Sequence, residues 1–450
     1  MRIAIAGAGP TGLFAAIALA RRGHDITVVD RDPGPLPDGT WARAGVMQFH
    51  HPHAFRIQVV EALSDEAPEV LAALFEAGAE RATVPGPPDA PEIAVGVRCR
   101  RLVFERVLRA AAESEPGVTM LCGHAEEVLV DRGRATGLRV DGHRLDTELV
   151  LDASGRSGRL TRGMRAPAQS GDCGVAYVSR QYRLRPGAEF GPMSMPIAGV
   201  AFYPGYGVIA FPHDNGIFSA LVLRASDDRA FTGMREVPAY EAVVAAVPLL
   251  AAWTDPARAL PITDVLPGGR LHNTYCGQLD RDGAVPLPGL VFLGDTVCTT
   301  NPAAGRGVAT SLTQVRQLLA LLDEGAAADI EAATRAFDAW CTGTIKPWFD
   351  DHVDCDAGLA ARWAGEDVDL SRRLPSDLIG AACEVDPSLM RVVGPYLGMQ
   401  ALPGSLDVVE SRVREIYASG WRPPVPAGPT RDELADLVAR AARREPVASA

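Results

Sequence analysis

Hydrophobic residues open the chain in a short run that ends at glycines. Residues 3–7 read IAIAG, and Leu13 and Ile17 then lie at the spacing of one helix face. Gly23 is suited to the end of that helix, and the apolar run DITVVD over residues 25–30 predicts a second strand. The order strand, helix, strand predicts a βαβ unit at the start of the chain.

The hydrophobic pattern changes further along the chain. RRLVFERVLRAAAE over residues 100–113 has helical spacing, whereas LVLDAS over 149–154 predicts a buried strand that leads into a glycine turn. Between 173 and 224, segments rich in β-branched and aromatic residues alternate with turn residues, which predicts a mainly antiparallel sheet. GLVFLGD over 289–295 returns to a buried strand, and residues 328–450 have a mainly helical pattern.

These elements predict an α/β protein: a Rossmann-like nucleotide-binding domain, split by a mainly antiparallel sheet domain and followed by C-terminal helices. We expect three segments of the nucleotide-binding domain, at 1–75, 99–165 and 286–325. The sheet domain, which we expect to bind the substrate, is predicted as an excursion at 76–98 and a main part at 166–285, and the helical region at 326–450.

The composition is that of an ordinary globular protein, and it narrows the choice of partners. The 450 residues are 47% hydrophobic and 22% charged, and the net charge of −12 argues against nucleic acid or an anionic membrane surface. No apolar run approaches the ~20 residues of a membrane helix, and the N-terminus lacks a signal-peptide cleavage pattern. We therefore expect a cytoplasmic monomer or homodimer. The eight cysteines include no CxxC pair, so neither a disulfide framework nor a zinc ribbon is indicated.

A glycine motif lies between the first strand and the first helix. Gly7, Gly9 and Gly12 form GxGxxG, in which the glycines allow a tight turn, close approach of a pyrophosphate and close helix packing. The helix start faces the phosphates with free N–H groups, and Asp30 at the end of the second strand is placed to bind a ribose hydroxyl. The residues expected to contact the nucleotide here are Gly7, Gly9, Pro10, Thr11, Gly12, Asp30 and Arg31.

A second motif indicates that the nucleotide is a flavin. In VFLGDTVCTTNPAAGRGVATSL, Asp295 ends an apolar strand and can accept hydrogen bonds from a ribityl chain. The loop with Pro302, Gly305 and Gly307 lets backbone approach a flat ring, and the helix that follows offers N–H groups and positive potential to the ring edge.

The order GxGxxG, RAGV, LDASG and GD–P–GxG resembles the FAD-dependent monooxygenases of the para-hydroxybenzoate hydroxylase type, over most of residues 1–325. The resemblance implies a GR2-type FAD domain split by the sheet domain, with Arg43, Arg101 and Asp295 in contact with FAD. It also implies the reaction, in which reduced flavin and O₂ form a C4a-hydroperoxide that delivers one oxygen atom to an organic molecule. Hydroxylation or epoxidation is expected ahead of Baeyer–Villiger insertion, with a role in secondary metabolism.

The chain departs from the family pattern in its middle motif. Ser154 stands where the family has the aspartate of a DG pair that serves both FAD and NAD(P)H. The electron source is therefore open between direct reduction by NAD(P)H and a separate reductase. Cys298 stands where the family often has a histidine after the GD motif, and a thiol there can simply pack.

Three histidines lie in RAGVMQFHHPHAFR, residues 43–56. A metal site needs three or four convergent ligands, and no carboxylate or cysteine lies in the stretch, so we predict no metal. Packing is one alternative. The other places His51 and His53 as catalytic groups in a wall of the flavin cavity, because they share a face of an extended segment and follow Arg43.

Rival functions remain open at this point. Flavin-dependent halogenases share the fold family, but they need a lysine near the flavin tunnel and a WxWxIP motif; the motif is absent and Lys346 is the single lysine. The enzyme alternative is an FAD-dependent reductase or dehydrogenase that acts on a lipid-like substrate. The alternative from another class is a non-catalytic FAD- or ligand-binding protein.

Overall fold

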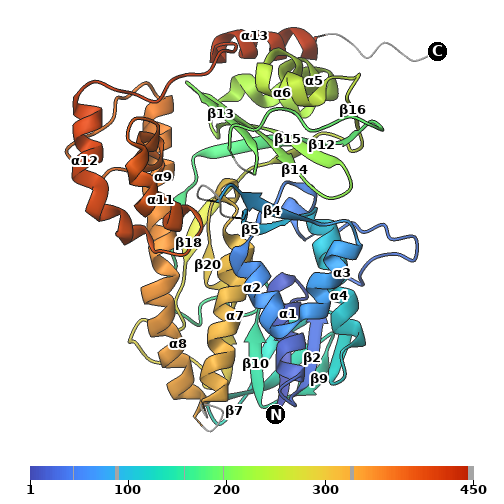
Figure 1. Cartoon of the computed structure of the whole chain (residues 1–450). Coiled ribbons are helices and arrows are strands. Elements are labelled where there is room, and N and C mark those ends of the chain that lie inside the picture. The colour runs from blue at the N-terminus through green and yellow to red at the C-terminus, as the bar shows by residue number, and fades with distance from the viewer. Residues whose placement is uncertain (44, 87–90, 157, 196, 325–328, 444–450) are drawn as a thin grey trace.

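The computed structural model describes residues 1–43, 45–86, 91–156, 158–195, 197–324 and 329–443 (Figure 1). A parallel sheet with its helices forms the lower part of the molecule in this view, and an antiparallel sheet covered by helices forms the upper part. Further helices from the C-terminal part of the chain stand along one side of both.

The parallel sheet is built from the strands that the apolar runs predict. Its order is β19 (Leu290–Phe292), β10 (Leu149–Asp152), β1 (Arg2–Ala6), β2 (Asp25–Asp30) and β6 (Val118–Cys122), and all four pairings are parallel. Ile3, Ala4 and Ile5 are fully buried, as expected for a central strand with both faces covered.

Helices and a small meander cover this sheet. Helix α1 (Pro10–Ala20) packs against α4 (Arg101–Ser114) and α7 (Gly307–Asp323), and Gly23 follows α1 with a φ of +81°, in the left-handed region that favours glycine. The antiparallel meander β7 (Ala125–Asp131), β8 (Arg134–Val140) and β9 (His143–Asp146) contacts β10. Helices α2 (Ile57–Glu66) and α3 (Pro68–Glu76) lead into the next small sheet.

Two small sheets join the main parts of the molecule. One has the order β3 (Phe55–Arg56), β5 (Ile93–Arg98) and β4 (Glu80–Val84). The other has the order β11 (Gln169–Asp172), β18 (His272–Tyr275) and β20 (Cys298–Thr299). The second sheet brings the chain back beside the loop before α7, which is where the flavin motif lies.

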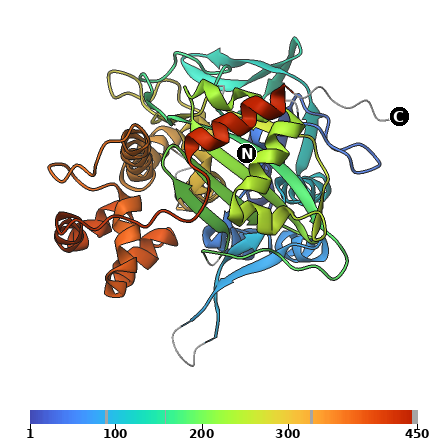
Figure 2. The same ribbon diagram turned by 90° about the horizontal axis from the view of Figure 1, so that it is seen from above.

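The antiparallel sheet confirms the strands predicted between 173 and 224. Its order is β13 (Gly199–Tyr203), β14 (Tyr206–Pro212), β15 (Ile217–Ala225), β12 (Val175–Leu184) and β16 (Ala259–Pro261), with β17 (Leu266–Gly268) also paired to β12. Helices α5 (Val237–Ala246), α6 (Pro248–Thr254) and α13 (Arg431–Ala442) cover one face, as Figure 2 shows from above. Alternation along β12 turns Tyr182 toward these helices and Tyr177 toward the opposite face.

The C-terminal helices divide between two places. Helices α8 (Ile330–Thr344), α9 (Lys346–Trp363), α10 (Ser376–Ala381), α11 (Met390–Leu397) and α12 (Asp407–Ala418) stand along the side of the molecule, and α9 to α12 share a small core of their own. Helix α13 instead packs on α5, where Leu434 and Val438 are buried in the core of the antiparallel sheet.

Among the described residues, no single helix is both long and apolar enough to cross a membrane. The consecutive helices α5 and α6 pass that test only when taken together, and they are bent by 113° at the break between them.

Candidate functional site

The loop between β1 and α1 places the three motif glycines in different surroundings. A Cβ on Gly7 would lie 2.4 Å from the carbonyl oxygen of Ala153, and one on Gly12 would lie 1.9 Å from that of Gly7. These two glycines are required by backbone packing. A Cβ on Gly9 would meet nothing within 4 Å, so the space beside Gly9, at the N-cap of α1, is open to a ligand.

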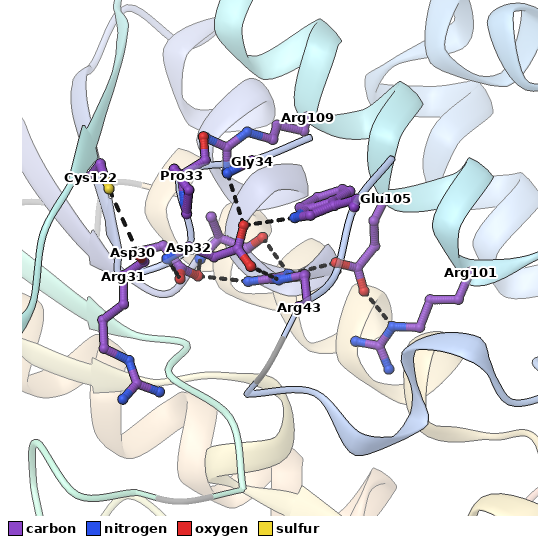
Figure 3. A network of polar contacts seen from close by, with 12 residues as sticks. Asp30, Arg31, Asp32, Pro33, Gly34, Arg43, Arg101, Glu105, Arg109 and Cys122 are labelled. Carbon is purple, nitrogen blue, oxygen red and sulfur yellow. Dashed lines mark hydrogen bonds and ion pairs between the residues drawn. The ribbon is translucent and has the colours of Figure 1, made fainter. Parts of the chain in front are cut away.

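Asp30 lies at the end of β2 and connects that strand to the glycine loop. Its Oδ2 accepts hydrogen bonds from the Ala8 N–H at 2.6 Å and from Arg43 Nη2 at 2.8 Å, and its Oδ1 accepts from the Asp32 N–H at 2.9 Å (Figure 3). The carboxylate oxygens retain acceptor capacity and the side chain is partly exposed, so a ribose hydroxyl can still bind here. The Arg31 side chain points away from this network.

Arg43 is buried at the centre of the network in Figure 3. Its Nη1 donates to the Ala8 carbonyl oxygen at 3.0 Å and to Glu105 Oε2 at 2.5 Å, and its guanidinium also lies near Asp32. Burial alone would lower the pKa of Arg43, but the surrounding carboxylates raise it overall. Arg43 therefore fixes the glycine loop and Asp30 to α4.

Glu105 links the two arginines that the family resemblance assigns to FAD. It is fully buried on α4, where it pairs with Arg43 and with Arg101 one helical turn earlier. Sequence reasoning missed Glu105, although an acid within the apolar spacing of LVFERVL was a visible signal. Glu105 thus holds both guanidinium groups in place from inside α4, as a buried charge requires hydrogen-bonded partners.

His53 continues this network toward the antiparallel sheet. Its Nδ1 lies 3.0 Å from the carbonyl oxygen of His51 and must donate there, so Nε2 is the acceptor that faces Arg101 Nη1 at 3.2 Å. Burial and the charge of Arg101 hold the pKa of His53 well below its usual value. The ring is therefore neutral, and both of its nitrogens are engaged.

His51 faces the sheet. Its Nδ1 lies 2.7 Å from Ser179 Oγ, and its ring meets the edge of Tyr177 at 4.8 Å between centroids. Burial lowers the pKa of His51 to about 4. The carbonyl oxygen of His50 accepts from Gln181 Nε2 at 2.7 Å, so this segment contacts β12 of the antiparallel sheet.

Asp295 follows β19 and lies near the start of α1, because a Cβ on the preceding Gly294 would be 2.6 Å from Thr11 Oγ1. Its side chain is accessible to water, yet enough protein surrounds it to raise the pKa of its carboxyl group by burial. Arg101 and Arg156 counteract the effect of burial on the Asp295 pKa, so both charges lie near its carboxyl group.

The loop after Asp295 has free space beside its backbone at the end nearest α7. Pro302 begins a short 3₁₀ turn, Gly305 has a φ of +61°, and a Cβ on Gly307 would meet nothing within 4 Å. Arg56, which sequence reasoning did not single out, donates from Nη2 to the Ala304 carbonyl oxygen at 2.7 Å and from Nε to that of Gly305 at 3.1 Å. The two predicted halves of the flavin site thus come together in space, and each has unfilled room in front of a glycine.

A hollow of about 570 Å³ lies at the edge of the antiparallel sheet, with Tyr177 in its wall. Arg224, Arg235 and Arg270 also line it, together with apolar side chains such as Phe231. Its volume is in the range of small-molecule pockets. Within the described residues, no three histidine, cysteine or acidic side chains lie close enough to hold a metal ion.

The N-terminal part of the chain matches a known family of flavoproteins. Residues 2–88 match the family model described as FAD dependent oxidoreductase. The chain is 47% identical to a D-amino acid dehydrogenase of Rhizobium johnstonii over 49 residues, 11% of this chain and only 12% of that protein. It is 24% identical to digeranylgeranylglycerophospholipid reductase 2 of Methanopyrus kandleri, over 69% of this chain and 74% of that protein.

Solved structures show the fold over most of the chain. The flavin-dependent brominase Bmp2 superposes with a TM-score of 0.67 at 15% identity, over 94% of this chain and all of that one. The probable FAD-dependent monooxygenase PqsL of Pseudomonas aeruginosa superposes with a TM-score of 0.54 at 18% identity, over 81% of this chain and 98% of that one. The predicted fold class is therefore confirmed, and the match and the fold together support the prediction of an FAD-dependent oxidoreductase.

Proposed function

We propose that this chain is an FAD-dependent monooxygenase that inserts one oxygen atom from O₂ into an organic small molecule, by hydroxylation or epoxidation. The observation that carries the proposal is the meeting of two loops beside Asp295, one with open space beside Gly9 and one with open space beside Gly307. The fold shared with PqsL supports it.

Different residues of the chain would hold different parts of FAD. Gly7, Gly9, Pro10, Thr11, Gly12, Asp30 and Arg31 would hold the adenosine and pyrophosphate end. Arg43 and Arg101, together with Asp295 and the loop from Pro302 to Gly307, would hold the ribityl chain and the flavin ring. Bound FAD would supply the activation of O₂, while the protein orients the substrate and excludes water.

A catalytic role for His51 or His53 stays a proposal. Each has a ring nitrogen engaged by a neighbouring group, and both are neutral at physiological pH because burial lowers their pKa values. If either moves a proton in the reaction, His51→Ala or His53→Ala should change the coupling of flavin oxidation to product formation. Unchanged coupling and turnover in both variants would remove the hypothesis.

The test of the function is anaerobic reduction of the purified protein with FAD, followed by O₂ and candidate substrates, with flavin absorbance and product mass recorded together. Organic acids belong among the candidates, because three arginines line the hollow beside Tyr177. A product heavier by one oxygen atom supports the proposal. A protein with no affinity for FAD would overturn it.

One alternative has a specific observation in its favour. The similarity to the archaeal phospholipid reductase extends over 69% of this chain, so reduction or dehydrogenation of a lipid-like substrate is the second candidate. It predicts a product that differs by two hydrogens, with no oxygen gained. A ligand returned unchanged after reduction and aeration would instead favour a non-catalytic FAD-binding protein.

The proposal also includes the source of the electrons, the cellular location and the division into domains. Ser154 replaces the aspartate of the family's DG pair, so we propose that a separate reductase supplies electrons more efficiently than NAD(P)H acting alone. Stopped-flow reduction of the bound flavin with NADH and with NADPH tests this, and fast reduction by either would contradict it. We further propose a cytoplasmic location and keep the three-segment division of the nucleotide-binding domain, 1–75, 99–165 and 286–325, as a proposal.

A further inference from the structure

The loop before α7 makes its side-chain contacts with the C-terminal helices. Arg306, between Gly305 and Gly307, is buried and directs its guanidinium to α9 and α11. Its Nη1 donates to Asp351 Oδ2 at 2.8 Å, and its Nη2 donates to the Tyr396 hydroxyl at 2.6 Å. A charged side chain within the proposed flavin loop is thus neutralised by residues from outside the nucleotide-binding domain.

Tyr396 is the shared point of this cluster. Its hydroxyl donates to Asp351 Oδ2 at 2.8 Å and lies 2.6 Å from Ser376 Oγ, while Arg306 also lies over the Trp348 ring at 4.6 Å from the centroid. The neighbouring His352 is neutral, because burial and then the charges of Arg306 and Arg56 lower its pKa. The carboxylate of Asp351 is therefore the counter-charge that keeps Arg306 in place.

Two further contacts hold the same loop at its start and its middle. The Asn301 side chain donates to Asp356 Oδ1 on α9 at 2.8 Å. Arg56, which binds the carbonyl oxygens of the loop, also donates from Nη1 to the Leu397 carbonyl oxygen at the end of α11 at 2.6 Å. The loop is thereby tied to α9 through Asn301 and to both α9 and α11 through Arg306, and Arg56 bridges its carbonyl oxygens to the end of α11.

We propose that α9 and α11 set the position of the flavin loop, with Asp351 and Tyr396 as positioning residues that act through Arg306. The loop consists mainly of small residues, so it has little apolar packing of its own to define its conformation. Its backbone must nevertheless lie at a defined distance from the flavin for hydrogen bonds to form. The inference rests on the FAD binding in the proposed function, and not on oxygen transfer.

Linkage makes the effect reciprocal. If docking of α11 favours the loop conformation that binds FAD, then bound FAD favours docking of α11 by the same factor. In the parent protein, FAD should therefore slow amide hydrogen exchange in α11 as well as in the glycine loop after β1.

The test is Tyr396→Phe, which removes the shared hydroxyl and keeps the ring on Trp348. FAD affinity is measured by quenching of flavin fluorescence without substrate or O₂. We expect the dissociation constant to rise about tenfold, as for the loss of a hydrogen bond to a charged group. The midpoint potential of the bound flavin should shift, and FAD should no longer slow exchange in α11.

Tyr417→Phe is the matched control. Tyr417 lies in the same helical core, but its hydroxyl donates to the Leu378 carbonyl oxygen within that core at 2.9 Å. This variant should lose stability and keep the FAD dissociation constant, the potential and the exchange response of the parent. Equal FAD affinity in the two variants would overturn the inference. A parent that does not bind FAD would overturn both the inference and the proposed function, whereas a parent that binds FAD but transfers no oxygen would overturn only the oxygenase.

Discussion

At the scale of single residues, Glu105 is the buried charge on which the network around Arg43 depends. The side chain is fully buried between two arginines, and removing its charge would leave both without their shared partner. We expect Glu105→Gln to lower the free energy of unfolding by about 3–5 kcal/mol. Glu113→Gln on the same helix, at a partly exposed pair with Arg109, should cost less than about 1 kcal/mol. Denaturant unfolding of both variants without FAD measures the difference, and similar losses would contradict the role given to Glu105.

Asp356 gives the stability of the protein a defined pH dependence. Burial raises the pKa of its carboxyl group from 3.8 to about 6, against the opposing effect of its hydrogen bonds from Asn273 and Asn301. The folded state thus holds this proton more tightly than the unfolded chain does. Its contribution to stability is complete below about pH 4 and is lost as the pH rises through about 6, by about 3 kcal/mol at most.

The measurement is the difference in unfolding free energy between the parent and Asp356→Asn, taken across that pH range. The parent should lose stability relative to the variant as the pH rises. Asp354→Asn, at an exposed position of the same helix, is the control for the general effect of removing a carboxylate from α9. A difference between the parent and Asp356→Asn that does not change with pH would contradict the prediction.

At the scale of elements, the β1–α1 unit separates a glycine required by backbone packing from a glycine that we propose lies against the cofactor. Gly12→Ala should prevent stable folding, because its Cβ would lie 1.9 Å from a backbone oxygen. Gly9→Ala should leave the unfolding free energy nearly unchanged, since its backbone is extended and its Cβ has space. The same methyl group would fill the space where we propose that the pyrophosphate binds, so we expect FAD affinity to fall at least about tenfold. Unfolding and FAD titration of both variants test this, and a Gly9→Ala protein with full affinity would place the phosphates elsewhere.

The elements that could be predicted are those with strong local patterns. The strand over 25–30, the helix near 101–114 and the strands between 175 and 225 follow from apolar runs and alternation, and the structure confirms them. The ties between Arg306 and Asp351 and between Asn301 and Asp356 join residues about fifty positions apart. No local sequence pattern predicts such a pair, because the partners meet only after α9 packs against β18 and β20.

At the scale of the whole molecule, the sequence motifs and the structural superpositions cover different lengths of the chain. The family resemblance in the sequence covers most of residues 1–325, whereas the brominase superposes over 94% of the chain and PqsL over 81%. Overall similarity at these identities establishes the fold and leaves the reaction to the chemistry of individual residues. Oxygen insertion and halogenation therefore have to be separated by a residue that only one of them needs.

Lys346 is that residue. Flavin-dependent halogenases, which share the fold family, need a lysine near the flavin tunnel, and Lys346 is the only lysine in the sequence. Its Nζ is bound by both carboxylate oxygens of Asp350 at 2.8 Å, one turn along α9. We expect turnover in excess bromide to yield the product with one added oxygen and no bromine isotope pattern in its mass spectrum. Lys346→Met should form that product at the parent rate. A brominated product that disappears in Lys346→Met would instead show that Lys346 takes part in halogenation, and the oxygenase proposal would then be wrong.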